Sequence, residues 1–204
     1  MGTDRDIDDL LIARFQAGER EMFNLLAVKY QGKLLRVVSR LVRNRADAEE
    51  VVQETLVLAY RALPRFRREA GFYTWLFQIA LNATRSFKKK EHLMADVSVK
   101  LYLENDARHE YGLEMIDEHS PAHSMENKQA IAALNRALDR LPLKLSCPLL
   151  LREFEGMHYV EIAQVMSCPI GTVRSRIARA RQRIAERLLP MTAAPQVKPG
   201  WAER

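Results

Sequence analysis

The chain is poor in the residues that stabilise secreted proteins and in the apolar runs that cross membranes. Only two cysteines, Cys147 and Cys168, occur among its 204 residues, too few for a disulfide framework or a cysteine metal cage. No run of about 18 apolar residues is present, so we expect no membrane span. The first residues also lack the basic and apolar parts of a secretion signal. We therefore expect a chain that works in a reducing cytoplasm without inserting into a membrane.

The sequence also has few residues in patterns that carry out catalysis. It contains no glycine-rich phosphate loop and no recognisable set of nucleophile, base and acid. His119 and His123 have a spacing found in metal sites, but Pro121 lies between them and breaks the helix that would align them. We therefore expect no enzyme, no metal, no cofactor and no small-molecule substrate.

What the chain does have is apolar residues in helical periods and an excess of basic charge. Hydrophobic residues make up 48% of the sequence, enough for globular cores. Lys and Arg number 32 against 26 Asp and Glu, for a formal net charge of +6. This excess favours nucleic acid or another anionic surface as a partner.

Residues 171–188 combine a dense run of arginines with an apolar seam at helical spacing. Their outward face is small or polar, at Ser175, Ala178 and Gln182. Such a helix suits a DNA major groove, where arginine reads guanine edges or contacts phosphates. A solvated basic helix is the alternative. The expected seam consists of Val173, Ile177, Ala180, Ile184 and Leu188.

The residues before this helix predict a helix-turn-helix. Ile162 and Met166 belong to a second, shorter apolar face, and Pro169 and Gly171 then turn the chain. Thr172 is expected to cap the next helix through its hydroxyl. Two helices joined by a tight turn, the second of them basic, are typical of a helix-turn-helix whose recognition helix begins near residue 173.

The first part of the chain predicts three helices, at residues 8–17, 19–43 and 47–63. Leu10, Leu11 and Phe15 are expected to face inward from the first helix, which Gly18 closes. The third helix is expected to begin at an Asp47 cap. The inward residues of the second helix are expected to be Phe23, Leu26, Tyr30, Leu34, Val37 and Leu41, and those of the third Val51, Thr55, Leu58, Ala59 and Ala62.

Two surfaces of this first part have unusual chemistry. The outer face of residues 47–63 is acidic around one aliphatic residue, which indicates either a solvated face or a protein-docking surface. A fourth helix, at residues 71–90, carries a stripe of one aromatic, two amides and two bases. Single-stranded nucleic acid is bound by such mixtures, although Trp75 in the core and a solvated basic end are equally compatible. The stripe consists of Trp75, Gln78, Asn82, Arg85 and Lys89.

The remaining pattern divides the chain into two small helical domains and gives an all-α fold. Acids dominate residues 93–124 without a lasting apolar period, as in a flexible linker. In the second domain, Pro142 ends a helix, Pro148 is expected to start the next at its first turn, and Gly156 closes it. We expect a first domain at residues 8–92, a linker at 93–124, a second domain at 125–190 and a disordered tail at 191–204.

Three stretches of the sequence resemble one known family. They are DAEEVVQETLVLAYRALPRF, GFYTWLFQIALN and LREFEGMHYVEIAQVMSCPIGTVRSRIARAR. These stretches resemble conserved regions two and four of an extracytoplasmic-function (ECF) sigma factor, and the resemblance covers residues 8–188. It implies transcription initiation, often in a stress response. The alternatives are a free-standing helix-turn-helix regulator, which predicts a dimer on a palindromic site, and a protein-interaction adaptor.

The resemblance also implies partners and roles for individual residues. The partners are core RNA polymerase, through the clamp helices of its largest subunit and its flap, promoter DNA in duplex and single-stranded form, and an anti-sigma factor, typically membrane-linked. Ser146, Cys147 and Pro148 depart from the continuous helix usual in the family. With the two surfaces above, the resemblance assigns polymerase binding to Asp47, Glu50, Gln53, Glu54 and Val57; minus-ten binding to Phe66, Arg67, Tyr73, Trp75, Gln78, Asn82, Arg85 and Lys89; and minus-35 binding to Thr172, Arg174, Ser175, Arg176 and Arg179.

Overall fold

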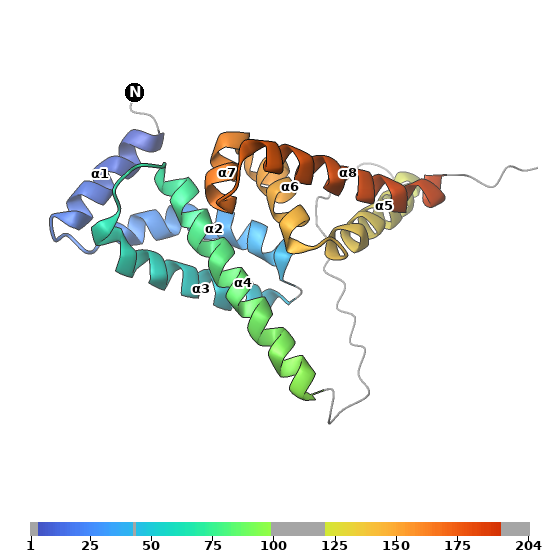
Figure 1. Ribbon diagram of the computed structural model, residues 1–204, viewed down its shortest axis with the longest axis horizontal. Helices are drawn as coiled ribbons and strands as arrows, with labels where there is room; N and C mark the ends of the chain where they lie inside the picture. Colours follow the sequence, from blue (N-terminus) through green and yellow to red (C-terminus); the bar gives the residue numbers. More distant parts are fainter. Residues whose placement is uncertain (1–3, 43, 99–120, 193–204) are drawn as a thin grey trace, which may run out of the picture.

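The structure is a computed structural model that describes residues 4–42, 44–98 and 121–192 (Figure 1). These residues form helices and short connections without strands, which confirms the predicted all-α class. The predicted linker lies largely outside the described residues, as do His119 and the tail beyond Thr192. The elements are α1 (Asp4–Gln16), α2 (Met22–Leu41), α3 (Arg45–Ala62), η1 (Leu63–Arg65), α4 (Phe72–Ser98), α5 (Pro121–Asp139), α6 (Leu143–Glu155), α7 (Tyr159–Met166) and α8 (Ile170–Thr192).

Helices α1, α3 and α4 pack around α2, as its apolar period predicts (Figure 1). All six residues predicted to face inward from α2 are buried. The prediction for α1 is wrong at Leu10, which is 60% exposed, whereas Ile12 is fully buried. The reason is a buried aspartate, Asp8, whose carboxylate accepts hydrogen bonds from the Lys29 ammonium at 2.7 Å and from the Tyr30 hydroxyl. Pairing satisfies this charge, so the helix turns its Asp8 face inward.

Helix α3 differs from its prediction at both ends. Its N-cap is Asn44 rather than Asp47, because the Asn44 side chain accepts a hydrogen bond from the Ala46 amide at 3.0 Å. At its other end Leu58 is 39% exposed, whereas Ala48 is fully buried. The buried face of α3 consists of Ala48, Val51, Val52, Thr55 and Ala59, which recur at helical spacing, and Leu58 and Ala62 lie outside that face.

The second domain consists of α5 to α8. Pro148 lies inside α6 rather than at its start, so the helix continues through the stretch that departs from the family pattern. It starts at Leu143 because Pro142, at the N-cap, accepts the amides of Leu145 and Ser146 through its carbonyl. As predicted, Gly156 ends α6, at a φ of 63° that glycine adopts without strain. Helix α4 continues to Ser98 and α5 begins at Pro121, so both enter the segment assigned to the linker.

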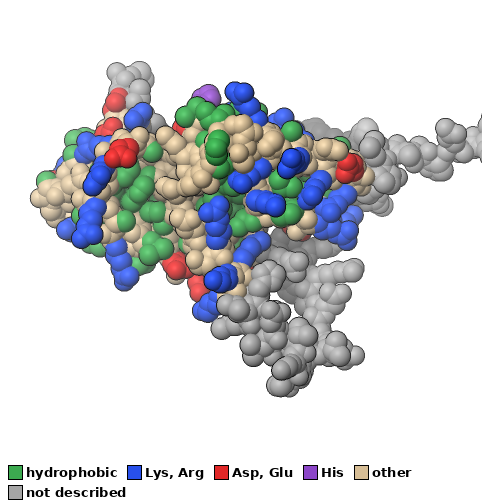
Figure 2. All heavy atoms as spheres, viewed as in Figure 1, with side chains coloured by type: hydrophobic (Ala, Val, Ile, Leu, Met, Phe, Trp, Pro, Cys, Tyr) green, Lys and Arg blue, Asp and Glu red, His purple; other side chains and the backbone are tan. Residues whose placement is uncertain are grey.

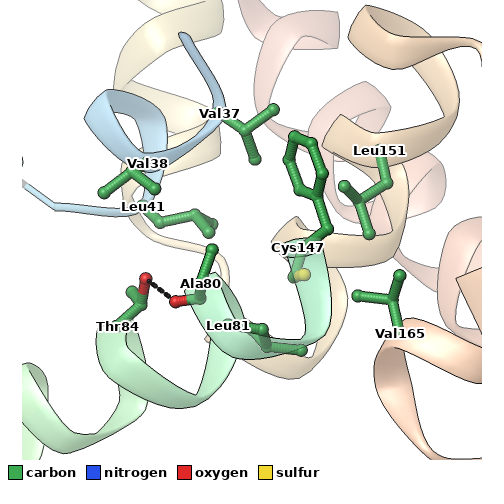
Figure 3. A pocket seen from close by; sticks show the side chains of 10 residues that line it. Val37, Val38, Leu41, Ala80, Leu81, Thr84, Cys147, Leu151 and Val165 are labelled. Carbon is green, nitrogen blue, oxygen red and sulfur yellow. Dashed lines mark hydrogen bonds between the residues drawn. The ribbon is translucent and has the colours of Figure 1, made fainter. Parts of the chain in front are cut away.

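The two domains pack directly against each other. Helix α6 is buried over every residue from Leu145 to Leu151, although a helix with one partner hides only one face. Its remaining faces are covered by the first domain, where Val37 and Leu41 of α2 lie close to Cys147 and Leu151 of α6 (Figure 3). The apolar core therefore runs from one domain into the other.

Candidate nucleic-acid interface

The outer face of α8 presents the side chains that the sequence assigns to duplex DNA. Its predicted seam is confirmed at Val173, Ile177 and Ala180, which are at most 2% exposed, whereas Ile184 and Leu188 are only half-buried. Arg174 and Ser175 lie on the exposed side. Figure 2 shows that Lys and Arg side chains follow α8 on the visible face and continue toward α4. A rigid helix with buried backing and basic borders has the shape and charge that a major groove requires.

The other predicted residues of α8 differ in exposure. Arg179 is exposed, whereas Thr172 and Arg176 are half-buried. Thr172 is not the cap of α8, which begins two residues earlier, because the Pro169 carbonyl accepts the amides of Thr172 and Val173 at 2.9 and 3.2 Å. Arg176 donates to the Cys168 sulfur at 3.6 Å, so it also braces the turn.

Local backbone and side-chain contacts define both ends of α7, the helix that precedes α8. His158 and Glu161 form a capping box at the start of α7, in which the Glu161 carboxylate accepts the His158 amide at 2.8 Å. At the other end, Ser167 adopts a left-handed φ of 49°, an uncommon conformation for a non-glycine residue. The Cys168 amide then bonds back to the Ala163 carbonyl at 3.0 Å. These contacts stabilise α7 and the turn of the predicted helix-turn-helix.

A second candidate surface is the stripe on α4. Trp75 is half-buried and rests on Phe66 and Phe72, with ring centroids 4.7 and 5.6 Å apart. Phe66 itself is only 9% exposed, so it supports Trp75 from below. The sequence left open whether Trp75 belongs to the core or to a nucleic-acid surface. Its side chain does both in part, since it packs on two aromatic rings but is only half-buried.

The far end of this stripe is open to solvent. Asn82, Arg85 and Lys89 are exposed, and Arg67 is exposed in the loop before α4. The Arg85 guanidinium donates to the Asn82 side-chain oxygen at 3.2 Å, which orients the amide. An oriented amide beside cations can contact both a base edge and the phosphate backbone.

The near end of the stripe is occupied by the second domain, which the sequence did not reveal. Tyr73 donates its hydroxyl hydrogen to Glu155 at the end of α6. Gln78 is half-buried and donates to the Ser167 hydroxyl at 3.1 Å, in the turn before α8. In this arrangement the α4 helix therefore contacts the second domain through the end of α6 and the turn before α8.

A third candidate surface lies on the exposed face of α3. Glu50, Gln53, Glu54 and Val57 are exposed, and Asp47 is half-buried. The sequence analysis missed two apolar members of this surface. The helical period had assigned Leu58 to the core, and Tyr60 had not been assigned to either face; they are 39% and 40% exposed.

Two further kinds of feature were expected to be absent, a metal site and a membrane span. In these parts of the chain, no three His, Cys, Asp or Glu side chains gather where a metal ion would bind. None of the helices at residues 4–98 and 121–192 is long and apolar enough to cross a bilayer.

The fold defines a helix-turn-helix protein of two helical domains, and comparison with known proteins gives its family. One family model, Sigma-70 region 2, matches residues 26–93, and another, Sigma-70, region 4, matches residues 131–184. The chain therefore belongs to the sigma-70 family of RNA polymerase sigma factors, in its extracytoplasmic-function group, as the resemblance implies.

Relatives of similar length support this placement. The chain is 40% identical over 194 residues to the RNA polymerase sigma-H factor of Pseudomonas aeruginosa, covering 90% of this chain and 95% of that one. It is 38% identical over 187 residues to the ECF RNA polymerase sigma-E factor of Escherichia coli, with coverage of 90% and 95%. A sigma factor, RpoE, solved in complex with the anti-sigma factor NepR from Bartonella quintana, matches with a TM-score of 0.65 and 25% identity, covering 83% of this chain and 98% of that one.

Proposed function

We propose that this chain is a dissociable specificity subunit that brings core RNA polymerase to promoters and opens their DNA. The observation that carries the proposal is that one chain holds two candidate DNA surfaces of different chemistry. The α8 face is rigid, basic and shaped for duplex, whereas the α4 stripe joins an outward aromatic to amides and cations. A regulator that only binds duplex needs the first surface and has no use for the second.

On duplex DNA, α8 enters the major groove of the minus-35 element. Ser175 and Ala178 are exposed on its outer face, and their small side chains let the helix approach closely. Arg174 and Arg179 then reach guanine edges or phosphates, where one good bidentate contact discriminates by about 1 to 3 kcal/mol. These contacts set the position of the protein along the promoter.

At the minus-ten element, the α4 stripe binds bases that have left the helix. Trp75 offers a ring face supported by Phe66, and stacking on an aromatic is worth about 1 to 3 kcal/mol per base. Asn82 contacts a base edge while Arg85 and Lys89 contact the backbone. Binding only the unpaired form shifts the duplex toward opening, which requires no catalytic group.

The exposed face of α3 docks on the polymerase, on the clamp helices of its largest subunit. Glu50 and Glu54 supply acidic charge, while Val57 and Leu58 supply apolar area at the centre. Charges around such a centre steer association, and the apolar contact provides affinity. The flap of the polymerase is the corresponding partner of the second domain.

Regulation follows from the same likeness. The Bartonella quintana sigma factor was solved in complex with an anti-sigma factor, and we propose that this chain is likewise held inactive by one in the cytoplasm, typically a membrane-linked protein. Its role is binding rather than catalysis.

Transcription from a library of randomised promoters, with core polymerase in the presence and absence of this protein, tests the function. We expect transcripts only with the protein, and the selected promoters to share two elements at a fixed spacing. Duplex binding to one element without any polymerase-dependent transcript would contradict the proposal.

A further inference from the structure

Three side chains from three helices of the second domain gather around one aromatic ring. Helices α6, α7 and α8 pack on one another (Figure 1). The Tyr159 ring, at the start of α7, has two guanidinium groups over it. The Arg152 group, from α6, lies 5.3 Å from the ring centroid, and the Arg174 group, from α8, lies 6.0 Å from it. A cation at such a distance is attracted by the negative face of the ring, so Tyr159 links α6 to the first turns of α8.

Tyr159 itself is held in place by its neighbours. The side chain is half-buried and packs against the apolar core. Its backbone follows His158, whose amide donates to the Glu161 carboxylate in the capping box of α7. Arg152 is also fixed, because its Nη1 donates to the Met157 carbonyl at 2.9 Å. The ring is therefore a firm support for a side chain that rests on it.

Arg174 is the member of this group that faces solvent. Its side chain is exposed, and within the described part of the chain its guanidinium takes part in no hydrogen bond or ion pair. Its backbone is well supported, because the amide of the preceding Val173 donates to the Pro169 carbonyl at 3.2 Å. The Tyr159 ring thus restricts the guanidinium while leaving its N–H groups available to DNA.

Arg179 of the same helix provides the contrast. It is exposed, and no hydrogen bond, ion pair or ring contact joins it to another of the described residues. A long side chain loses rotamer freedom when it binds, and restricting it beforehand lowers that cost. Arg174 therefore enters a groove partly ordered, whereas Arg179 becomes ordered only on the DNA.

We propose that Tyr159 is a positioning residue, which orients Arg174 for contact with duplex DNA. This inference rests on the duplex-binding part of the proposed function and adds a residue that belongs to none of the three candidate surfaces. The attraction comes from the face of the ring, so phenylalanine can replace tyrosine and an aliphatic side chain cannot.

Arginine side-chain order in the free protein tests the contact itself. The heteronuclear NOE at Nε is measured for Arg174 and Arg179 in the full chain, with signals assigned from Arg174→Lys and Arg179→Lys. We expect a higher value for Arg174 than for Arg179 in the parent and in Tyr159→Phe, and a fall to the Arg179 value in Tyr159→Leu. Equal values for the two arginines in the parent would overturn the proposal.

Affinity for a minus-35 duplex tests the role of the contact in binding. The duplex is selected from a randomised pool by binding to the protein alone, and affinities are measured by anisotropy. We expect Tyr159→Leu to weaken binding about three- to tenfold and Tyr159→Phe to stay within about twofold of the parent. A loss in Tyr159→Phe as large as in Tyr159→Leu would assign the effect to the hydroxyl, and unchanged binding in Tyr159→Leu would remove it; either result overturns the proposal.

A double-mutant cycle separates positioning from a general effect on the fold. In an Arg174→Ala background, Tyr159→Leu should have little further effect, because the side chain that it positions is gone. In an Arg179→Ala background, which is the matched control, Tyr159→Leu should still weaken binding about three- to tenfold. The same loss in both backgrounds would show that Tyr159 acts through the fold rather than through Arg174 and would overturn the proposal.

These measurements need no polymerase, so the inference and the proposed function can fail separately. Coupling between Tyr159 and Arg174 without any polymerase-dependent transcript would leave the positioning role standing and overturn the proposed function. Transcription by a chain in which the two residues are uncoupled would do the opposite.

Discussion

The arginines of α8 differ in what they contact. The Arg181 guanidinium pairs with Glu153 at 2.6 Å, a bond that raises its pKa, and Arg187 donates to the Ala137 carbonyl at 3.2 Å. Both hold α8 to its own domain. Arg179 is exposed and has no hydrogen-bond or ion-pair partner among the described residues. The count of arginines therefore overstates the number available to DNA.

This division predicts different effects of two alanine substitutions on duplex binding. Arg179→Ala should weaken binding to a minus-35 duplex and lower the slope of log affinity against log salt by about 1, because one phosphate or base contact is lost. Arg181→Ala should change the slope much less, since Glu153 already neutralises that charge. Titrations at several salt concentrations measure both. Equal slopes for the two variants would contradict the assignment.

A substitution at Asn82 tests the role of the stripe without disturbing the fold, because the Asn82 side chain is exposed. Asn82→Ala should reduce promoter opening about five- to tenfold, the effect of one lost hydrogen bond of ~1 kcal/mol. Binding to the minus-35 duplex should stay nearly unchanged. Opening is followed with 2-aminopurine in the minus-ten element, and duplex affinity by anisotropy. A parallel loss of both would show that the two surfaces do not act separately.

At the scale of the elements, the connection from α6 to α7 depends on the backbone conformation of one glycine. Gly156 ends α6 in the left-handed region, and a Cβ added there would meet no atom within 4 Å. Glycine is therefore required at this position by the backbone conformation and not by a lack of space for a side chain. Gly171, in the first turn of α8, also has room for a Cβ but keeps an ordinary negative φ.

The two glycines form a matched pair for a stability measurement. Gly156→Ala should lower the free energy of unfolding by about 1 kcal/mol, because alanine is strained at this φ. Gly171→Ala should leave it unchanged or raise it by up to about 1 kcal/mol, since alanine favours the helix. Urea unfolding followed by circular dichroism measures both. The same sign for the two variants would contradict the backbone argument.

At the scale of the whole molecule, the seam between the domains makes stability depend on pH. Burial raises the pKa of the Cys147 thiol from 9.0 to about 12, with Arg85 and Arg176 opposing it. A raised pKa means that the stabilisation is complete below about pH 9 and is lost as the pH rises toward about 12. Within that window this one group lowers the free energy of unfolding by up to about 1.4 kcal/mol per pH unit.

Cys147→Ala should lack this contribution. Between about pH 8 and about pH 10.5, we expect urea unfolding to show a larger loss of stability for the parent than for Cys147→Ala. Cys168→Ala is the control, since the half-buried Cys168 lies outside the seam, and it should keep the parent's pH dependence. Identical pH dependence in all three proteins would show that Cys147 is not sealed between the domains.

The sequence predicted what a regular apolar period determines and missed what tertiary contacts determine. The seams of α2 and α8 follow from residues at steps of three and four. Leu10 was misplaced because a buried, paired Asp8 turned α1, a contact to α2 that no local pattern shows. The docking of α6 against the first domain was missed because the helix was expected to start at Pro148, whereas its buried residues begin at Leu145. The stripe on α4 was found, but its partial cover by Glu155 and Ser167 was not.

The claim that this chain opens promoters with polymerase is tested most directly by permanganate reactivity of promoter thymines. A promoter selected from the randomised library is incubated with core polymerase alone, with the chain alone and with both. We predict reactive thymines near the start site only when both are present, with the signal reduced by Asn82→Ala. Reactivity with polymerase alone, or an unopened promoter in the complete mixture, would contradict the account.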